Sequence, residues 1–251
     1  AIENQAGAIL KKTGISTSVS TVDWDVVNNG TLDVDGGRLE FRKGFSGSGS
    51  ADLAANGELK LKNLDADSTL TVNGDGFLSL NTSNTTGTGN HSLTIDGTYN
   101  VGKSGVTSFL GTTVLNDGDA KLIGNLASSP TSASDTTEWR NRSGASLELV
   151  ESADLTINHN NARTLINDVG ATVLKTGTST SLSTVDWDVV NNGTLDVDGG
   201  RLEFRKGFSG SGSADIAANG ELKLNNLDAN SALTVNGDGF LSLNTSNTTG
   251  T

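Results

Sequence analysis

One stretch of 32 residues occurs twice in the chain without a single change. It reads TVDWDVVNNGTLDVDGGRLEFRKGFSGSGSAD, and it begins at Thr21 and again at Thr184, 163 positions later. The similarity extends further, because residues 1–88 and 164–251 are identical at 74 of 88 positions. A long internal repeat is typical of tandem architectures, in which each unit packs on the next. The sequence therefore predicts a full repeat unit at residues 1–163 and a partial second copy, continuous with it, at residues 164–251.

A shorter period lies inside the long one. Eight glycines each open a short phrase in which apolar and polar residues alternate, such as GTLDV, GELKL and GFLSL. These glycines are Gly7, Gly30, Gly57, Gly76, Gly97, Gly118, Gly144 and Gly170. They divide the 163-residue unit into seven coils of about 23 residues each, a period typical of solenoids.

The alternating phrases predict β-strands that bury one face, as in STLTV and ADLTI. Asn or Asp precedes many of the glycines, and Asn-Gly and Asp-Gly favour sharp bends. The same dipeptides occur in hairpins, which would give an antiparallel sandwich. The chain contains many consecutive units with a similar internal order, joined by connecting segments of variable length. This arrangement favours a coiled parallel sheet instead. In that sheet we expect Leu32, Val34, Leu39 and Phe41 to be core residues.

Composition narrows the class of protein. Only 33% of the residues are hydrophobic and 32 of the 251 are glycine, which is unusual for a compact enzyme of this length. The net charge of −12 argues against a nucleic-acid partner, because phosphates require a basic surface. No apolar run is long enough to span a membrane, so we expect no membrane insertion. The start at Ala1, without a signal peptide, indicates excision from a longer protein.

Two longer segments, NNGTLDVDGGRLEF and NGELKLKNLDADSTLTVNGDGFLSLNTSNTTGTGN, carry a family resemblance. They resemble the β-helices of bacterial surface adhesins of the filamentous-haemagglutinin and autotransporter-passenger kind. The resemblance covers most of the chain and implies an all-β fold, a right-handed parallel β-helix or β-solenoid. It also implies a protein that is secreted and held at the bacterial cell surface, in association with the outer membrane. It carries over no binding residue, because these families share no binding motif.

We therefore expect a non-catalytic structural or adhesive segment of a large, secreted, repetitive bacterial surface protein. Hydrogen-bonded coils would form an elongated rod, and the repeat would multiply its binding surface. The expected partners are host-cell or surface glycans or other cell-surface molecules. Open end coils would also favour end-to-end self-association.

Three tryptophans and four acids are the candidate ligand-binding residues. They are Trp24 with Asp23 and Asp25, their copies Trp187 with Asp186 and Asp188, and Trp139. A ring between acids can stack on a sugar, but it can equally pack at a corner of a coil. Trp139 stands in the longest irregular stretch, residues 125–143. A loop leaving the solenoid there would be a natural binding surface.

Alternating carboxylates are the candidate metal ligands. They are Asp33 and Asp35 and their copies Asp196 and Asp198. Carboxylate oxygens suit Ca²⁺, the one cofactor that the sequence suggests, but these acids alternate with core residues and so face solvent. One alternative function is a calcium-dependent carbohydrate-binding module. Another is a polysaccharide-degrading lyase or hydrolase on the same scaffold, with neighbouring arginines and paired acids. Two nearly identical copies favour structure or repeated binding over catalysis.

Overall fold

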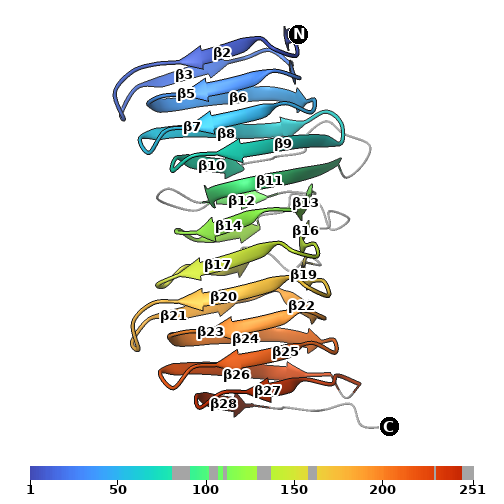
Figure 1. Cartoon of the computed structure of the whole chain (residues 1–251). Coiled ribbons are helices and arrows are strands. Elements are labelled where there is room, and N and C mark those ends of the chain that lie inside the picture. Colours follow the sequence, from blue (N-terminus) through green and yellow to red (C-terminus); the bar gives the residue numbers. More distant parts are fainter. Residues whose placement is uncertain are drawn as a thin grey trace.

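The chain forms a rod of coiled β-strands in a computed structural model (Figure 1). The structure describes residues 1–80, 91–101, 107–109, 112–128, 137–157, 163–228 and 230–244. Within these ranges there are 28 strands and no helix. The strands of successive turns pair in parallel and form a β-solenoid of about ten turns with roughly 21 residues per turn. The predicted all-β solenoid is confirmed, and the antiparallel sandwich is excluded.

Each turn contributes strands to three parallel stacks, numbered I, II and III. Stack I contains β2 (Ile9–Lys12), β5 (Thr31–Val34), β7 (Ser50–Leu53), β9 (Ser68–Asn73), β11 (His91–Val101), β13 (Thr112–Asn116), β16 (Thr137–Asn141), β19 (Arg163–Asn167) and β22 (Asp188–Asn191). Stack II contains β3 (Val19–Val22), β6 (Gly37–Ser46), β8 (Gly57–Leu64), β10 (Phe77–Leu80), β14 (Asp119–Leu122), β17 (Ser146–Val150), β20 (Thr172–Thr176), β23 (Thr194–Val197), β25 (Ser213–Ile216) and β27 (Thr234–Asn236). Stack III contains β1 (Ile2–Asn4), β4 (Val26–Asn28), β12 (Thr107–Phe109), β15 (Leu126–Ser128), β18 (Leu155–Ile157), β21 (Leu182–Val185), β24 (Gly200–Ser209), β26 (Gly220–Leu227) and β28 (Phe240–Leu243). The long strands β6, β8, β11, β24 and β26 continue into a second stack.

The apolar residues of the alternating phrases fill the interior of the rod. Between β6 and β8, Leu39 pairs with Leu59 and Phe41 pairs with Leu61, and all four side chains are buried. Burying a side chain of this size stabilises a fold by roughly 1.5–3 kcal/mol. The core residues predicted from the sequence are all buried, namely Leu32, Val34, Leu39 and Phe41. The alternating pattern therefore identified the inner face of these strands correctly.

Buried asparagines end six of the strands. They are Asn4 and Asn28 in stack III and Asn116, Asn141, Asn167 and Asn191 in stack I. Within each stack the Nδ2 of one asparagine donates to the Oδ1 of the next, at 2.8 to 3.4 Å. These amides also donate to backbone carbonyls, for example from Asn167 to Thr194 O at 3.1 Å. The asparagine ladder thereby satisfies backbone groups at a corner where the strand pairing ends.

The ladder was not among the features predicted from the sequence. The predicted bends use the Asn or Asp directly before each glycine, whereas the ladder residue stands two or three positions before the glycine, as in NNG and NDVG. The spacing from Asn28 to Gly30 and from Asn167 to Gly170 shows the pattern. Reading the asparagines by register from coil to coil would have shown them.

The turns are slightly shorter than the glycine spacing predicts, and they vary in length. Partners in adjacent turns are 19 residues apart for Thr31 and Ser50, and 26 residues apart for Asn141 and Asn167. The glycines overestimate the turn because they do not share one corner. Gly30 precedes β5 in stack I, whereas Gly57 begins β8 in stack II. The interval between these two glycines therefore covers one turn and one further face.

The second copy enters the coil one stack later than the first. Strands β2, β5 and β7 lie in stack I, whereas their copies β20, β23 and β25 lie in stack II. From β2 the chain passes through stack I seven more times, the last time at β19, before it reaches β20. The long repeat therefore spans the seven predicted coils plus one face. Strand β19 pairs with β16 before it and β22 after it, so the coil runs through the boundary between the copies without a break.

The stacks wind around the rod, and this winding cancels the shift between the copies. In Figure 1, strands β2, β5 and β7 and their copies β20, β23 and β25 run across the same side, and the loops before β3 and β21 both protrude at the left. A shift of one stack in three is a third of a revolution. Offsetting it over about seven turns of the coil requires the stacks to wind by roughly 15–20° per turn, which is within the twist between neighbouring strands of ordinary sheets. The repeat therefore returns its surface to the same side of the rod.

Candidate functional site

Trp24 and Trp187 have opposite environments although their local sequences are identical. Trp24 is 67% exposed, whereas Trp187 is 1% exposed. The Trp187 Nε1 donates to Thr156 O of β18 at 3.1 Å, so the preceding turn covers this ring. The equivalent of β18 for Trp24 would precede Ala1, outside the sequence. Trp187 therefore fills a corner between turns and is not available to stack on a ligand, while the binding role of Trp24 stays a prediction.

Trp139 does not stand in a loop that leaves the solenoid, so that prediction is wrong. It lies in β16, its side chain is fully buried, and its Nε1 donates to Asn141 Oδ1 at 2.9 Å. The irregular composition of residues 125–143 conceals β15 and β16, and residues 129–136 lie outside the described part of the chain. Trp139 supports the asparagine ladder and is closed to a ligand.

The acids beside the tryptophans make structural contacts. Asp25 Oδ1 accepts a hydrogen bond from the backbone where the register of β6 shifts, at 3.1 Å. Asp23 lies 3.8 Å from the Nη1 of Arg42. The same contacts recur in the second copy, at 3.0 Å for Asp188 and 3.8 Å for Asp186. Asp25 and Asp188 therefore hold the backbone where the registers of β6 and β24 shift, whereas Asp23 and Asp186 make longer contacts with an arginine at the surface.

Asp33 and Asp35 share a lysine on the outer face. Lys11 Nζ lies 2.7 Å from Asp33 and 2.8 Å from Asp35. Its hydrogen bonds to these two carboxylates raise the pKa of Lys11 above its usual value, and the bond to Asp35 lowers the pKa of that carboxyl. Among the residues that the structure describes, no group of three or more His, Asp or Glu side chains is arranged to hold a metal ion. Calcium binding stays a prediction.

The second copy lacks this lysine, because Leu174 stands at the position of Lys11. Burial, followed by repulsion from Asp198, raises the pKa of Asp196. The same pair of acids is therefore in a different electrostatic environment in each copy. One position on the neighbouring strand decides whether the pair is neutralised.

This difference predicts that Asp196→Asn stabilises the protein near pH 7 more than near pH 3.5. The pKa of Asp196 is raised in the folded state, so its contribution is fully present below the unfolded pKa of about 3.9 and is lost as pH rises through the folded pKa. Thermal unfolding at the two pH values measures the effect. Asp33→Asn is the control, and we expect no gain from it because Asp33 pairs with Lys11. An equal gain from both variants would contradict this account.

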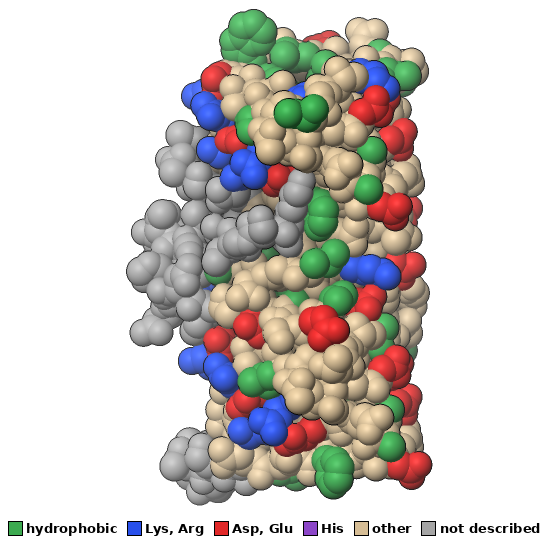
Figure 2. All heavy atoms as spheres, turned by 90° about the vertical axis from the view of Figure 1, so that its left-hand side faces the viewer, with side chains coloured by type: hydrophobic (Ala, Val, Ile, Leu, Met, Phe, Trp, Pro, Cys, Tyr) green, Lys and Arg blue, Asp and Glu red, His purple; other side chains and the backbone are tan. Residues whose placement is uncertain are grey.

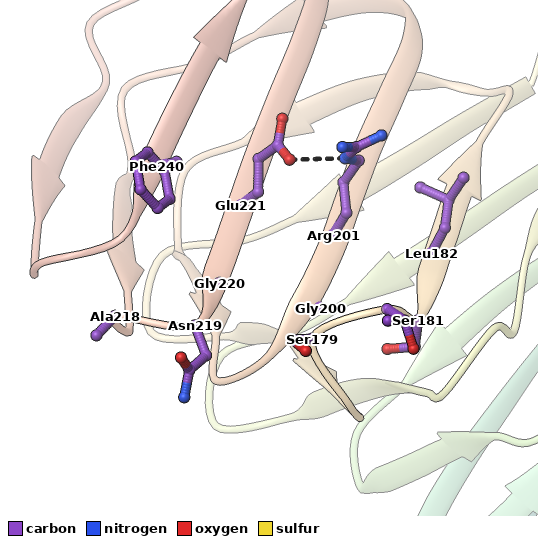
Figure 3. Close-up of a pocket in the computed structure, with 11 residues that line it drawn as sticks. Ser179, Ser181, Leu182, Gly200, Arg201, Ala218, Asn219, Gly220, Glu221 and Phe240 are labelled. Atoms are coloured by element: carbon purple, nitrogen blue, oxygen red, sulfur yellow. Dashed lines mark hydrogen bonds and ion pairs between the residues drawn. The ribbon is translucent and has the colours of Figure 1, made fainter.

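A groove opens on the outer face of stack III in the second copy (Figure 3). Its floor is a row of four residues in register across β21, β24, β26 and β28, namely Leu182, Arg201, Glu221 and Phe240. The loop at residues 179–181 and the corner at residues 218–220 both border the groove on the side where strands β21 and β26 begin (Figure 3). The groove has a volume of about 600 Å³, a size typical of small-molecule sites.

The charged pair in the groove is ordered by its neighbours. Arg201 Nε donates to Glu221 Oε2 at 2.7 Å, and Ser242 Oγ donates to Glu221 Oε1 at 2.9 Å. Burial alone would raise the pKa of Glu221, but these hydrogen bonds hold it below its usual value. Glu221 is therefore an ionised acceptor at neutral pH, which makes it unsuited to act as a general acid.

A buried lysine holds the loop that borders the groove. The Lys175 side chain is fully buried, and its Nζ donates to Glu151 O at 2.6 Å, Thr176 O at 2.5 Å and Ser181 Oγ at 3.1 Å. Burial lowers the pKa of this lysine. Gly200 has φ +73°, and a Cβ there would clash with Ser181 Oγ. The glycine is therefore required for the loop to close against β24.

The same arrangement recurs in the first copy. Val19, Arg38, Glu58 and Phe77 are in register across β3, β6, β8 and β10, and Arg38 Nε lies 2.9 Å from Glu58 Oε2. Lys12 is buried and donates to backbone carbonyls and to a serine, as its copy does. The residues of this first-copy surface match the groove residues with a single change, Val19 for Leu182. A repeated local structure thus presents this row twice.

Both rows lie on one side of the rod. The loops that border them, before β3 and before β21, protrude together in Figure 1. Figure 2 views the rod from that side and shows basic and acidic side chains next to one another near both ends. Further ion pairs lie next to the rows, because Glu40 and Glu203 stand two residues after Arg38 and Arg201 on the same strands. They are Lys62–Glu40 at 2.9 Å and Lys223–Glu203 at 3.1 Å. The carboxylates of both pairs are nearly covered, with 7% of the Glu40 side chain and 10% of the Glu203 side chain exposed.

This row was not predicted, although the sequence contains a signal for it. The phrases GRLEF, GELKL and GFLSL each place one residue between the glycine and the first core leucine. That residue points outward, and the three phrases follow one another at intervals of about one turn. Aligning them places Arg, Glu and Phe side by side, which is the row that the structure contains.

Comparison with known proteins adds no relative. No family model, curated protein or solved structure matches the chain. In the described residues no helix is long and apolar enough to cross a membrane. The rod and the surface that occurs in both copies are therefore the basis for proposing a function.

Proposed function

We propose that the chain is a non-catalytic structural and adhesive segment of a large, secreted, repetitive bacterial surface protein. The observation that carries the proposal is the return of one outward surface to the same side of the rod in the second copy. A duplicated rod segment lengthens the molecule, and a surface that faces one way can meet a cell or matrix at several points. The expected location is the bacterial cell surface, in association with the outer membrane.

The architecture supports a mechanical role. Each turn hydrogen-bonds to the turns before and after it, so a further unit extends the rod without altering the existing one. One repeat of about seven turns advances the rod by roughly 35 Å at the usual strand spacing of about 4.8 Å. The net charge of −12 favours solubility in a long, exposed molecule.

Small-angle X-ray scattering tests the rod. We compare the present chain with a chain that carries one additional copy of the long repeat. The longest dimension should increase by roughly 35 Å while the radius of the cross-section stays constant. A thicker particle with little gain in length would show that the added unit folds back, and that result would refute the rod.

The alternative of a polysaccharide-degrading enzyme has one observation in its favour, the arginine and carboxylate in the groove. The hydrogen bonds that keep Glu221 ionised favour binding over proton donation. We therefore expect no release of reducing ends or unsaturated products from acidic or neutral polysaccharides. Sustained turnover that disappears in Glu221→Gln would replace the adhesive proposal with the enzyme.

A further inference from the structure

We propose that the groove lined by Leu182, Arg201, Glu221 and Phe240 binds a short, uncharged glycan segment, and that the matching first-copy surface is a second site for it. The inference rests on the proposed adhesive function, because it assigns the repeated surface a ligand class. Its evidence is separate, since it comes from the chemistry of one row of side chains.

The groove offers both donors and acceptors at its floor and rim. Arg201 donates only and ionised Glu221 accepts only, and the two lie side by side. At the edge Ser179 adds a hydroxyl, whereas the side chain of Asn219 points away from Arg201 and Glu221 (Figure 3). Each sugar hydroxyl is both a donor and an acceptor, so neighbouring hydroxyls can satisfy both members of the pair. The Glu221 carboxylate would repel a phosphate, and the Arg201 guanidinium would repel a metal ion. An uncharged polyhydroxy ligand is therefore favoured.

An aromatic ring closes one end of the row. Figure 3 places Phe240 beside Glu221 and at the far end of the row from Leu182. The apolar face of a sugar ring can cover such an aromatic surface, as amphipathic ligands commonly do. Four strands at about 4.8 Å spacing place roughly 14 Å between Leu182 and Phe240. That length suits an oligosaccharide segment laid across the strands.

The site is ordered before a ligand arrives. Lys175 fixes Ser181 and its loop, and the ion pair fixes Arg201 against Glu221. Less conformational freedom is therefore lost when a ligand binds. The Arg201 side chain is nevertheless 45% exposed and that of Glu221 26% exposed, so both remain within reach of a ligand.

The first-copy surface is more closed than the groove. Glu58 is nearly covered, with 6% of its side chain exposed. Phe77 is half-buried, and β11 lies beyond it, with Asn100 in register. Two sites on one side, roughly 35 Å apart at about 4.8 Å per turn, would engage a glycan-coated surface together.

Saturation-transfer NMR and calorimetry with the full chain test the proposal. The probes are maltotetraose, cellotetraose, chitotetraose and tetragalacturonate. At least one neutral tetrasaccharide should bind, and Arg201→Ala and Phe240→Ala should each raise its Kd about tenfold or more. Arg38→Ala should raise it as well, because Arg38 occupies the same place in the first-copy surface. Arg142→Ala is the control, because Arg142 directly follows β16, is partly exposed and pairs with Asp117 outside the groove.

Two results would overturn the site as a glycan site of this class. One is no binding of the neutral probes at millimolar concentration, or a Kd for a neutral probe that Arg201→Ala leaves unchanged. The other is binding of tetragalacturonate alone, which would show that charge attraction by arginine determines the ligand. Scattering from the same variants separates this failure from failure of the scaffold. A rod of unchanged length without glycan binding leaves the scaffold intact and removes the groove as a binding site.

Discussion

Replacing Trp187 with alanine should lower the free energy of unfolding by about 3–5 kcal/mol, the usual cost of removing a large buried aromatic side chain. The ring is fully buried in the middle of the rod, and its Nε1 bonds to the preceding turn. Its removal opens a cavity between turns and interrupts the stacking between the two copies. Denaturation followed by circular dichroism measures the loss.

Trp24→Ala is the matched control, because 32 residues around the two tryptophans are identical. Trp24 is mostly exposed, and exposed substitutions usually change stability by no more than about 0.5 kcal/mol. Equal losses from the two variants would contradict the assignment of Trp187 to a corner between turns. They would also show that the identical segments respond to local sequence alone.

The asparagine ladder gives the second large effect. Asn191→Ala should cost roughly 2–4 kcal/mol, because it removes two hydrogen bonds of the buried ladder, at about 1–3 kcal/mol each. Asn167 Nδ2 donates to Asn191 at 2.8 Å, and Ser213 O accepts from Asn191 at 3.3 Å. The same denaturation experiment applies.

The adjacent residue supplies the control for the ladder. Asn192 belongs to the same NNG phrase, but its Oδ1 accepts an exposed hydrogen bond from Ser211 N at 3.3 Å. Asn192→Ala should therefore change stability by only about 0.5 kcal/mol. If both alanine variants lose equal stability, the phrase acts through its bend and the ladder has no special weight.

The solenoid was predictable because its strands are simple. Alternating Leu and Val residues specify an inner face, and Asx-Gly pairs specify bends, so Leu32 and Phe41 could be placed in the core. The length of each turn was not predictable from the glycines, because Gly30 and Gly57 lie at different corners. The register between two turns depends on how their strands pair, so it cannot be derived from the sequence of one strand alone.

The site residues were harder to predict, for a related reason. Trp24 and Trp187 share one sequence, and the burial of Trp187 comes from β18 in the preceding turn. Asp33 and Asp196 also share their sequence, yet Lys11 or Leu174 on the adjacent strand decides their electrostatics. In a solenoid the neighbours of a residue are about 20 positions away. Local motifs therefore describe a strand well and its environment poorly.

The winding of the three stacks limits how the repeat can change in length. Extra residues in a loop, such as those that make Leu155 and Val185 partners across 30 positions, leave the angular position of later copies unchanged. Gain or loss of a single strand would instead turn every later copy by about a third of a revolution. The number of strands per repeat can therefore change only in steps of about one whole turn, which is three strands, if every copy is to present its surface on the same side of the rod.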